Sequence, residues 1–360
     1  MRTVYVLLAL VLALAACGPE QTAAVPVTTP GATTDAGILT VMTHDSFDVS
    51  DHVVAAFEEQ CNCQVRFLRS GDAGLMLNQA LLSAENPLAD VIYGVDNTFL
   101  SRALAGDILE AYPAPGLADI PDELELDPEH RMLPVDFGDV CLNYDKAWLE
   151  ERDLAPPADL VTLTRPEYKG LTVVENPATS SPGLAFLLAT VGRFGESGDY
   201  DYLDYWADLR ANDVLVARGW EDAYWGSFTY ASDGDRPIVV SYASSPPVEV
   251  YFAEEPFDTA PTGVVASDGS CFRQVEFVGI LKGTENRELA ERWIDFMLGV
   301  TFQEDIPLKM FVFPVNSRAE LPDVFARFAE IPDQPVSIQP DRIESSREDW
   351  VQEWTRVVLR

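Results

Sequence analysis

Short apolar runs alternate with amphipathic segments in the first third of the chain. Runs typical of strands cover residues 37–44, 63–70 and 89–96, and helical patterns follow them at residues 48–61, 72–85 and 97–107. In the first helical pattern, Val53, Val54 and Phe57 are spaced to share one apolar face. A repeating order of strand and helix favours a parallel sheet with helices on both of its faces.

The order changes after Pro113, where the pattern predicts a second unit of strands and helices at about residues 136–262. Residues 132–149 combine a strand, interrupted by a charged break, with a following helix. Further strands are predicted at residues 170–177, 214–219 and 236–242, and further helices at residues 181–195, 201–213 and 220–230. Beyond them come a strand at residues 272–281 and helices at residues 286–299, 322–331 and 346–359.

A chain that completes one α/β unit, builds a second and then returns to the first pattern predicts two lobes joined by two crossings. We expect residues 38–135 and 270–360 to form the first lobe and residues 136–269 to form the second. Ligands of such folds bind at the carboxyl ends of strands, where two lobes face each other. The fold class is therefore α/β, with a candidate binding site between the lobes.

The first residues have the features of a secretory signal. Arg2 precedes an apolar run at residues 4–14, and small residues then lead to Cys17 in the sequence LAAC, which matches a bacterial lipobox. The match implies that residues 1–16 are a signal peptide and that the sulfur of Cys17 carries lipid. The apolar run is shorter than the roughly 20 residues of a transmembrane helix. Residues 17–37 are rich in Thr, Pro, Ala and Gly, which predicts a flexible tether.

The charge of the chain narrows the range of its partners. There are 24 Lys and Arg residues against 59 Asp and Glu residues, a formal net charge of −35 at pH 7. Such a surface repels nucleic acid and anionic lipid and attracts cations, so we expect no nucleic-acid partner. For most of these carboxylates, a soluble acidic surface is a sufficient explanation.

Cysteine usage agrees with an oxidising compartment outside the cytoplasm. Besides Cys17, the chain has four cysteines: Cys61, Cys63, Cys141 and Cys271. Disulfides are favoured over a zinc site because no CxxC pair is present. Cys61 and Cys63 can close a small ring, which leaves Cys141 to pair with Cys271. A bridge from Cys61 or Cys63 to another cysteine is also open.

Three of the predicted helices that follow a strand begin with polar residues. Asp72 opens one helix, and the pairs Ser180–Ser181 and Ser244–Ser245 each stand before a proline at the start of another. Serine followed by proline is typical of the N-cap and first residue of a helix, so capping alone explains any single junction. Free N–H groups at helix starts also bind hydroxyl, carboxylate or phosphate oxygens. Three such junctions in two lobes favour polar ligand contacts at the four serines.

Aromatic residues stand beside these junctions. Trp220 begins a helix directly after Gly219, and Tyr242 ends a strand, so both side chains can face a cleft. Tyr224 and Phe228 have the helical spacing of core residues instead. A flat π face beside carboxylates suits a flat, positively charged heterocycle.

Eight short segments, taken together, resemble one known family. In chain order they are THDSFDVS, FEEQCNC, GVDNTFL, NYDK, NPATSSPGL, GWEDAY, VVSYASSP and FPV. Their order and spacing from about Leu39 to Arg360 are similar to those of the thiamine-binding proteins of bacterial ABC transporters. The resemblance implies a two-lobe periplasmic-binding-protein fold of type II with a hinge. It also implies a ligand that is thiamine, thiamine monophosphate or thiamine diphosphate, with no cofactor.

The same resemblance implies partners and a location. The protein would deliver its ligand to an ABC permease and ATPase complex, and it would act as a monomer. Its lipid would anchor it to the cell membrane outside the cytoplasm, in a periplasm or at the outer face of the plasma membrane.

Transferred position by position, the resemblance assigns the ligand contacts. They are Asp72, Ala73, Ser180, Ser181, Trp220, Tyr242, Ala243, Ser244 and Ser245. Trp220 would stack on the ligand, and the helix that starts at Ser180–Ser181 would bind its hydroxyl or phosphate end. A tyrosine of the family's pattern is His44 here, and a tryptophan of its cleft is Phe311, so these two residues join the expected contacts.

Other functions are less well supported by the residues. The sequence HDSFDVSDH contains two histidines, His44 and His52, but their separation of eight residues does not suit a metal site, and we expect none. A ferric-ion or polyamine binder of the same fold is the main alternative, although only Tyr242 is well placed to bind iron. An extracellular hydrolase is less favoured because GxSxG, HExxH, GxGxxG and P-loop motifs are absent. We therefore expect a binding protein and not an enzyme.

Overall fold

The computed structural model describes residues 37–254, 257–336 and 338–360. The predicted signal peptide, the lipidation site Cys17 and the predicted tether up to residue 36 lie outside these described residues. Within the described part of the chain, no helix has both the length and the apolar character needed to cross a membrane.

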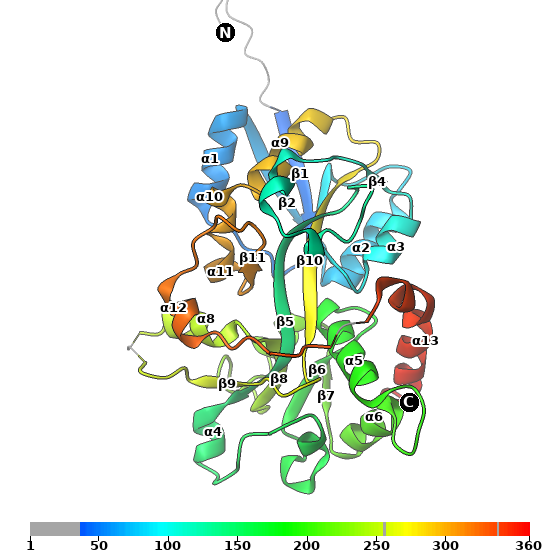
Figure 1. The fold of residues 1–360 in the computed structure, drawn as a ribbon, viewed down its shortest axis with the longest axis vertical. Coiled ribbons are helices and arrows are strands. Elements are labelled where there is room, and N and C mark those ends of the chain that lie inside the picture. Colours follow the sequence, from blue (N-terminus) through cyan, green and yellow to red (C-terminus); the bar gives the residue numbers. More distant parts are fainter. Residues whose placement is uncertain (1–36, 255–256, 337) are drawn as a thin grey trace, which may run out of the picture. The chain divides into compact units, whose positions relative to one another are not determined.

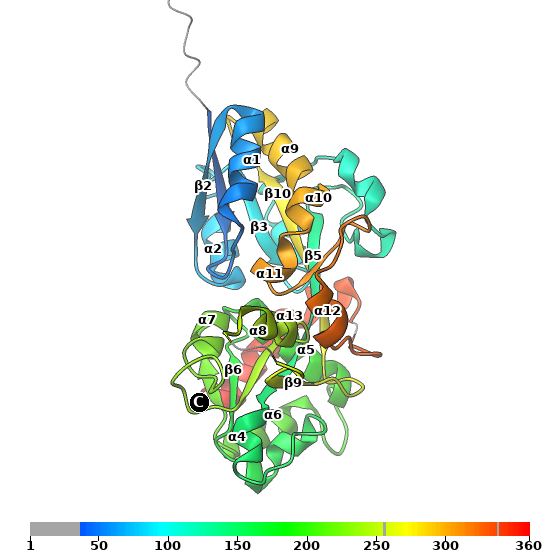
Figure 2. The same cartoon turned by 90° about the vertical axis from the view of Figure 1, so that its left-hand side faces the viewer.

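The strands of the described residues form one eleven-stranded sheet, most of which follows the order β2-β1-β3-β10-β5-β8-β6-β7 (Figures 1 and 2). Away from this path, β4 pairs with β10, while β9 and β11 pair with β5. The strands are β1 (Gly37–Thr43), β2 (Cys63–Arg69), β3 (Val91–Asp96), β4 (Leu109–Glu110), β5 (Leu133–Asp145), β6 (Thr172–Glu175), β7 (Leu215–Ala217), β8 (Ile238–Tyr242), β9 (Thr262–Val265), β10 (Phe272–Leu281) and β11 (Phe313–Pro314).

Helices lie between most of these strands. The α-helices are α1 (Asp51–Cys61), α2 (Ala73–Leu82), α3 (Leu100–Ala105), α4 (Lys146–Glu150), α5 (Ser181–Phe194), α6 (Tyr202–Ala211), α7 (Trp220–Tyr224), α8 (Ser245–Phe252), α9 (Arg287–Met297), α10 (Val300–Gln303), α11 (Ile306–Lys309), α12 (Asp323–Phe328) and α13 (Pro340–Val358). Short 3₁₀ helices are η1 (Pro115–Asp119), η2 (Asp122–Leu124), η3 (Val161–Thr164) and η4 (Pro166–Tyr168).

Two lobes can be distinguished within the described residues. We define the first lobe as residues 37–137 and 275–320, and the second lobe as residues 138–274. In the first lobe β1 is parallel to β2 and β3, which confirms the predicted order of strand and helix. In the second lobe β6 is parallel to β7 and β8. Both lobes are therefore α/β, as the residue pattern predicts.

Two long strands pass from one lobe to the other. β5 and β10 run side by side and antiparallel, with Phe272 opposite Val140 at one end and Val278 opposite Leu133 at the other (Figure 1). Their register shifts after Glu276. Because a twisted pair of strands is narrower than a lobe, these crossings are the natural place for the lobes to move relative to each other.

The predicted charged break within residues 132–149 is wrong, because β5 is one continuous strand. Asp136 and Asp139 are almost fully buried in it, yet both have partners. The guanidinium of Arg273 donates two hydrogen bonds to Asp139, at 3.0 and 2.8 Å. The hydroxyl of Tyr93 donates to Asp136 at 2.5 Å. These contacts replace part of the water that the two acidic groups lose, so the strand can continue through them.

The core of the first lobe forms where α9 packs on the sheet and on α1. Trp293 and Met297 are fully buried, and the ring of Trp293 meets Phe57 edge-on at 4.9 Å. Leu289 and Phe296 are partly buried beside them. The helix predicted at residues 286–299 therefore turns an apolar face inward.

The C-terminal helix differs from the prediction that residues 270–360 belong to the first lobe. α13 packs mainly on α6 of the second lobe (Figure 1), where the rings of Trp354 and Trp206 lie edge to face at 5.5 Å. It also reaches α3 of the first lobe, where the guanidinium of Arg347 lies 5.4 Å from the ring centre of Phe99. The large indole of Trp354 needs an apolar partner, and α6 provides one.

The four cysteines of the folded region are paired as in the first of the two arrangements considered above. Cys61 bonds to Cys63, with Cα atoms 5.2 Å apart, and Cys141 bonds to Cys271, with Cα atoms 4.4 Å apart. Cys141 lies in β5, and Cys271 directly precedes β10. The second bridge therefore fastens the two crossing strands to each other at their second-lobe end.

Candidate ligand-binding site

A cavity of about 360 Å³ lies between the two lobes. This volume falls in the range of small-molecule sites, about 300–1,000 Å³. The cavity is lined by His44, Ser46, Asp48, Asp72, Ala73, Ser181, Pro182, Trp220, Glu221, Trp225, Tyr242, Phe252, Glu276, Leu308, Lys309, Met310, Phe311 and Val312. Both lobes contribute to this wall, so a molecule inside would contact both at once.

Trp220 is held firmly at the second-lobe side of the cavity. Its ring stacks on Tyr224, with centres 4.8 Å apart and planes 18° apart. Its indole N–H donates to the hydroxyl of Ser241 at 3.0 Å. The ring of Phe311 meets it edge-on at 6.1 Å. The indole is thus fixed by protein contacts, and its remaining surface lines the cavity.

Phe311 brings the first lobe to the same aromatic cluster. Its φ of 63° is in the left-handed region, which bulky residues rarely adopt. The hydroxyl of Ser244, in the second lobe, donates to its carbonyl oxygen. Backbone strain of this kind persists only where surrounding contacts hold it. Ser244 is one such contact, and it joins the two lobes beside the cavity.

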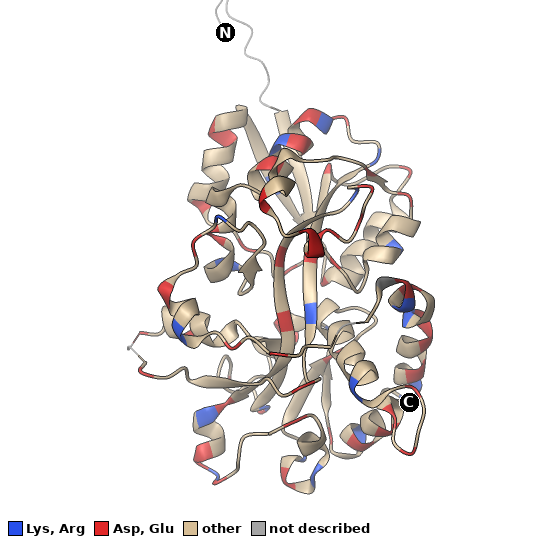
Figure 3. Ribbon diagram, viewed as in Figure 1, with Lys and Arg blue, Asp and Glu red and all other residues tan. Residues whose placement is uncertain are grey.

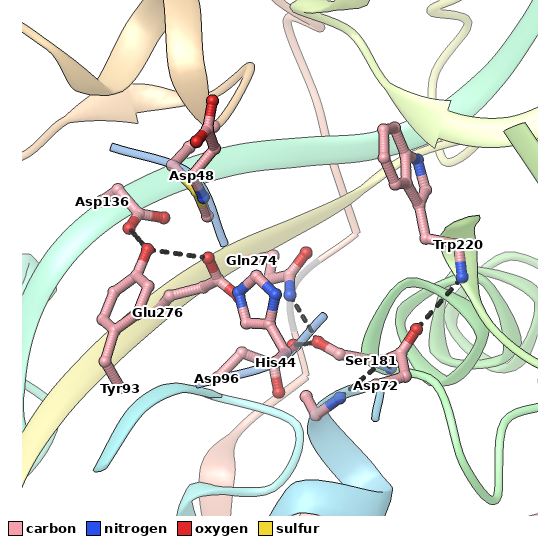
Figure 4. Close-up of polar contacts among 12 residues, drawn as sticks. His44, Asp48, Asp72, Tyr93, Asp96, Asp136, Ser181, Trp220, Gln274 and Glu276 are labelled. Carbon is pink, nitrogen blue, oxygen red and sulfur yellow. Dashed lines mark hydrogen bonds and ion pairs between the residues drawn. The ribbon is translucent and has the colours of Figure 1, made fainter. Parts of the chain in front are cut away.

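Asp72 connects the starts of three helices (Figure 4). It is the N-cap of α2, where its Oδ1 accepts a hydrogen bond from the N–H of Ala73 at 2.7 Å. The same oxygen accepts from the N–H of Ser181 at 3.0 Å, and Oδ2 accepts from the N–H of Trp220 at 3.1 Å. Ser181 begins α5 and Trp220 begins α7, both in the second lobe. Asp72 is therefore a polar contact between the lobes.

A second chain of hydrogen bonds runs from the first lobe to the end of β8. The hydroxyl of Ser181 donates to Asp96 at 2.5 Å, and the side-chain amide of Gln274 donates to that same hydroxyl at 2.5 Å. The hydroxyl of Tyr242 then donates to the amide oxygen of Gln274 at 2.9 Å. Burial raises the pKa of Asp96 to about 6, although hydrogen bonds from Ser181 and Thr98 act in the opposite direction.

His44 belongs to a buried ionisable group on the first-lobe side (Figure 4). Its Nε2 lies 3.5 Å from Oε1 of Glu276, and the hydroxyl of Tyr93 lies between Glu276 and Asp136. Burial alone would lower the pKa of His44, but the charge of Glu276, the hydrogen bond to it and the charges of Asp72 and Asp45 together outweigh burial and raise that pKa. Burial and the charge of Glu276 together raise the pKa of Asp136 well above its ordinary value. The group therefore favours a protonated His44 beside an ionised Glu276.

The rest of the cavity wall is also acidic. Glu221 extends it at α7, and burial raises the pKa of this carboxyl. Asp48 lies there too, paired with Lys309 at 2.9 Å. Acidic residues are found along elements of both lobes in Figure 3, and Asp48, Asp72, Glu221 and Glu276 are the acidic residues that line the cavity. Such a wall attracts a cation.

Metal binding has no evident centre in the described part of the chain. Among those residues, no group of three or more His, Cys, Asp or Glu side chains is placed to hold a metal ion. Among the described residues that line the cavity, Tyr242 is the one tyrosine.

The structure brings seven of the expected contact residues to the cavity wall and leaves four away from it. The seven are His44, Asp72, Ala73, Ser181, Trp220, Tyr242 and Phe311. The four described residues that do not line it are Ser180, Ala243, Ser244 and Ser245. All four are almost completely buried.

The three serines among these four make contacts within the protein instead. The hydroxyl of Ser180 caps α5 by accepting from the N–H of Gly183 at 3.4 Å. Ser244 donates to the carbonyl of the Phe311 loop, and the hydroxyl of Ser245 meets that of Ser241 at 3.1 Å. Of the four serines in the two Ser-Ser-Pro turns, Ser181 is the one that lines the cavity, and the ligand contacts expected at the other three stay a prediction.

Several wall residues were not expected from the sequence. Glu276 could have been noticed as a carboxylate within the otherwise apolar run VEFVGIL. Glu221 directly follows the aromatic residue that was selected at the start of α7. Phe252 and Trp225 carried no local signal, because an aromatic residue at helical spacing is usually a core residue.

The fold and this geometry agree with one family of known proteins. The family model described as bacterial extracellular solute-binding protein matches residues 86–329. This chain belongs to that family. It is a family of solute-binding proteins and not a class of enzymes, and its members act outside the cytoplasm.

The relatives of this solute-binding protein include thiamine-binding proteins. A thiamine-binding periplasmic protein of Salmonella typhimurium is 31% identical over 331 residues, which cover 90% of this chain and 94% of that protein. One of Escherichia coli is 30% identical, with the same coverage of both chains. The solved structure of a periplasmic thiamin binding protein superposes with a TM-score of 0.80 at 27% identity, and covers 92% of this chain and 99% of that one.

Proposed function

We propose that this solute-binding protein captures thiamine outside the cytoplasm and delivers it to an ABC permease. The observation that carries the proposal is the composition of the cavity wall. A fixed indole, Trp220, stands beside the carboxylates of Asp72, Glu221 and Glu276. Thiamine carries a flat cationic thiazolium ring, and aromatic faces and carboxylates both attract such a cation. Relatives at 30–31% identity are named as thiamine-binding proteins, which supports the same ligand.

The two-lobe construction explains how capture would proceed. A ligand shifts the balance between open and closed forms only if it binds one form better. Thiamine in this cavity would touch the first lobe at Phe311 and the second lobe at Trp220, and these two contacts come together only when the lobes are close. Movement about β5 and β10 would then give a closed, loaded form for the permease to recognise. No cofactor and no turnover of the ligand are part of this proposal.

The membrane attachment belongs to the same proposal. The LAAC sequence before residue 18 supports cleavage of a signal peptide and lipidation of Cys17. A lipid there and a tether up to residue 37 would keep a monomeric receptor close to its permease. Mass spectrometry of the mature N-terminus would check the lipid directly.

A polyamine is the second candidate, because the acidic wall would attract any small organic cation. A flexible aliphatic diamine gains less than a flat ring from the face of Trp220. Competition between thiamine and putrescine for the same site would rank the two ligands.

The test of the proposed function is the loss of Trp220. Trp220→Ala should weaken thiamine binding by about 1–3 kcal/mol, or about 5- to 150-fold in Kd, because the stacking face is lost. Isothermal titration calorimetry on the full-length protein, freed of co-purified ligand, would measure this. Trp148→Ala is a matched control, because Trp148 lies in α4 and does not line the cavity. Failure of the wild-type protein to bind thiamine would overturn the proposal.

A further inference from the structure

His44 places a titratable ring at the wall of the cavity. It directly follows β1, it lines the cavity, and it is only 7% exposed. Its ring packs against Gly94, where a Cβ atom would collide with Cδ2 of the imidazole. The ring of Tyr93 lies beside it, with ring centres 5.8 Å apart. Contacts on two sides therefore hold the imidazole at the cavity.

The contact between His44 and Glu276 is loose. Nε2 of His44 is buried and makes no hydrogen bond with the residues that the structure describes. Oε1 of Glu276 lies 3.5 Å from it, beyond the usual N–H···O distance of about 2.7–3.2 Å. The other oxygen of Glu276 accepts a hydrogen bond from the hydroxyl of Tyr93 at 3.3 Å. Oε1 is therefore a carboxylate oxygen of the cavity wall that can change its partner.

The titratable groups that face His44 are all acids. They are Glu276 of β10, Asp45 next to it in the chain, Asp72 at the start of α2, Glu221 of α7 and Tyr93 of β3. Behind Tyr93, burial and the charge of Glu276 raise the pKa of Asp136 in β5, so this acid is held neutral. Among the described wall residues the other base is Lys309, and it is paired with Asp48. The surroundings of His44 therefore hold a proton on its ring.

A proton on His44 and a cation in the cavity compete for the same carboxylate. While His44 is protonated, it and Glu276 together carry no net charge, and the imidazolium repels a second cation. Once the proton leaves, the charge of Glu276 is unbalanced and attracts the cation. Such charges act strongly here because a partly buried site is screened much less than the surface.

We propose that thiamine capture by this protein releases one proton from His44. The cationic ligand replaces the imidazolium as the partner of Glu276, and the proton passes to water. Binding is then weaker in mildly acidic surroundings and stronger in neutral or alkaline ones, because a proton that is lost on binding opposes it. The inference rests on the proposed function, and it adds the control of the same site by pH.

The first measurement follows affinity and protons in the wild-type protein. Calorimetric titration of the full-length protein with thiamine should give a Kd that falls by about tenfold from pH 6 to pH 8, since one exchanged proton changes Kd by up to about tenfold per pH unit. Titrations in buffers of different ionisation enthalpy should show protons released on binding. A flat profile without proton release would overturn the inference and leave the proposed function standing. Absence of thiamine binding at every pH would instead overturn the proposed function.

His44→Gln tests whether His44 is the group that exchanges the proton. Glutamine keeps a polar side chain but does not titrate, so the Kd of the variant should change by about threefold or less over the same range. Asp96, whose pKa burial raises to about 6, titrates there too, but it is present in both proteins and does not contribute to their difference. A slope as steep as that of the wild type would overturn the inference.

His52→Gln is the matched control. His52 is an exposed residue of α1 that does not line the cavity, so this variant should keep the slope of the wild type. Loss of the slope in both variants would show that it does not report on the cavity, which would overturn the inference.

Nuclear magnetic resonance of the histidine rings tests the proposal without changing His44. The chain has three histidines, so spectra of His52→Gln and His130→Gln assign the signal of His44 even if His44→Gln does not fold. Saturating thiamine should move the titration midpoint of His44 in the wild-type protein to lower pH, because a nearby cation disfavours the imidazolium. A midpoint that does not move would overturn the inference.

Discussion

The two Ser-Ser-Pro turns are the same in sequence and different in what they do. At the start of α5, the hydroxyl of Ser180 caps its own helix, and Ser181 reaches the first lobe through Asp96. At the start of α8, no side chain caps the helix. There Ser244 donates to a carbonyl of the opposite lobe, and Ser245 supports its own lobe.

This difference shows that the local motif decides only that a helix begins. Which atoms then face the cavity depends on what the other lobe brings to each turn. The α5 turn meets two carboxylates, Asp72 and Asp96, so its polar groups become part of an ionisable contact between the lobes. The α8 turn meets the backbone of Phe311, so its polar groups form a neutral contact.

The test with the largest expected effect changes the pH, because of the two turns only the α5 turn contacts a carboxylate. Burial raises the pKa of Asp96 from 3.8 to about 6, so the folded protein holds this proton more tightly than the unfolded chain. Its contribution to the free energy of unfolding therefore falls as the pH rises from about 4 to above 6, by about 2–3 kcal/mol. Denaturant titrations of wild type and Asp96→Asn at pH 4 and pH 7 would measure it.

The variant lacks this proton, so its free energy of unfolding relative to wild type should rise by about 2–3 kcal/mol between the two pH values. Titrating groups that do not interact with Asp96 are common to both proteins and cancel in the difference. If the difference stays constant with pH, the α5 turn is as neutral as the α8 turn and the comparison fails.

A smaller effect is expected from removing one hydroxyl at each turn. Ser181→Ala leaves buried atoms of Asp96 and Gln274 without their shared partner, which should lower the free energy of unfolding by about 2 kcal/mol. Ser244→Ala removes one neutral hydrogen bond and should cost about 1 kcal/mol. Urea titration of both variants would rank them, and a larger loss in Ser244→Ala would reverse the assignment of roles.

The smallest effect concerns the support of the indole. Ser245→Ala removes the contact between Ser245 and Ser241, but Ser241 keeps its hydrogen bond from Trp220. We expect a loss of about 0.5–1 kcal/mol in the free energy of unfolding and little change in thiamine affinity. Calorimetry and thermal unfolding together would check this. A clear loss of affinity would mean that the α8 turn contributes directly to the site.

The sequence predicts most of the fold because its regular features are local. The alternation of strand and helix, the apolar face around Trp293 and the helix start at Asp72 each depend on neighbouring residues only. The continuity of β5 could not be predicted in this way. Asp139 reads as a break until Arg273, far along the chain, is seen to lie beside it.

The site was predictable to the extent that its residues end or begin an element. Trp220, Tyr242 and Asp72 stand at such positions, and all three line the cavity. Glu276 lies in the middle of a strand, and its importance depends on His44 from the distant N-terminal segment. Ser245 begins a helix with the same Ser-Ser-Pro sequence that places Ser181 at the cavity, but its hydroxyl meets that of Ser241 and it does not line the cavity. Contacts between distant segments are what the pattern of residues does not contain.

The position of helix α13 offers a way to follow the movement of the lobes. The helix packs on α6 of the second lobe through Trp354, while Arg347 lies over Phe99 in the first lobe. If the lobes separate while α13 stays packed on α6, the distance between Arg347 and Phe99 must increase. A pair of spectroscopic labels placed next to these two positions, neither of which lines the cavity, would therefore follow loading and release in real time.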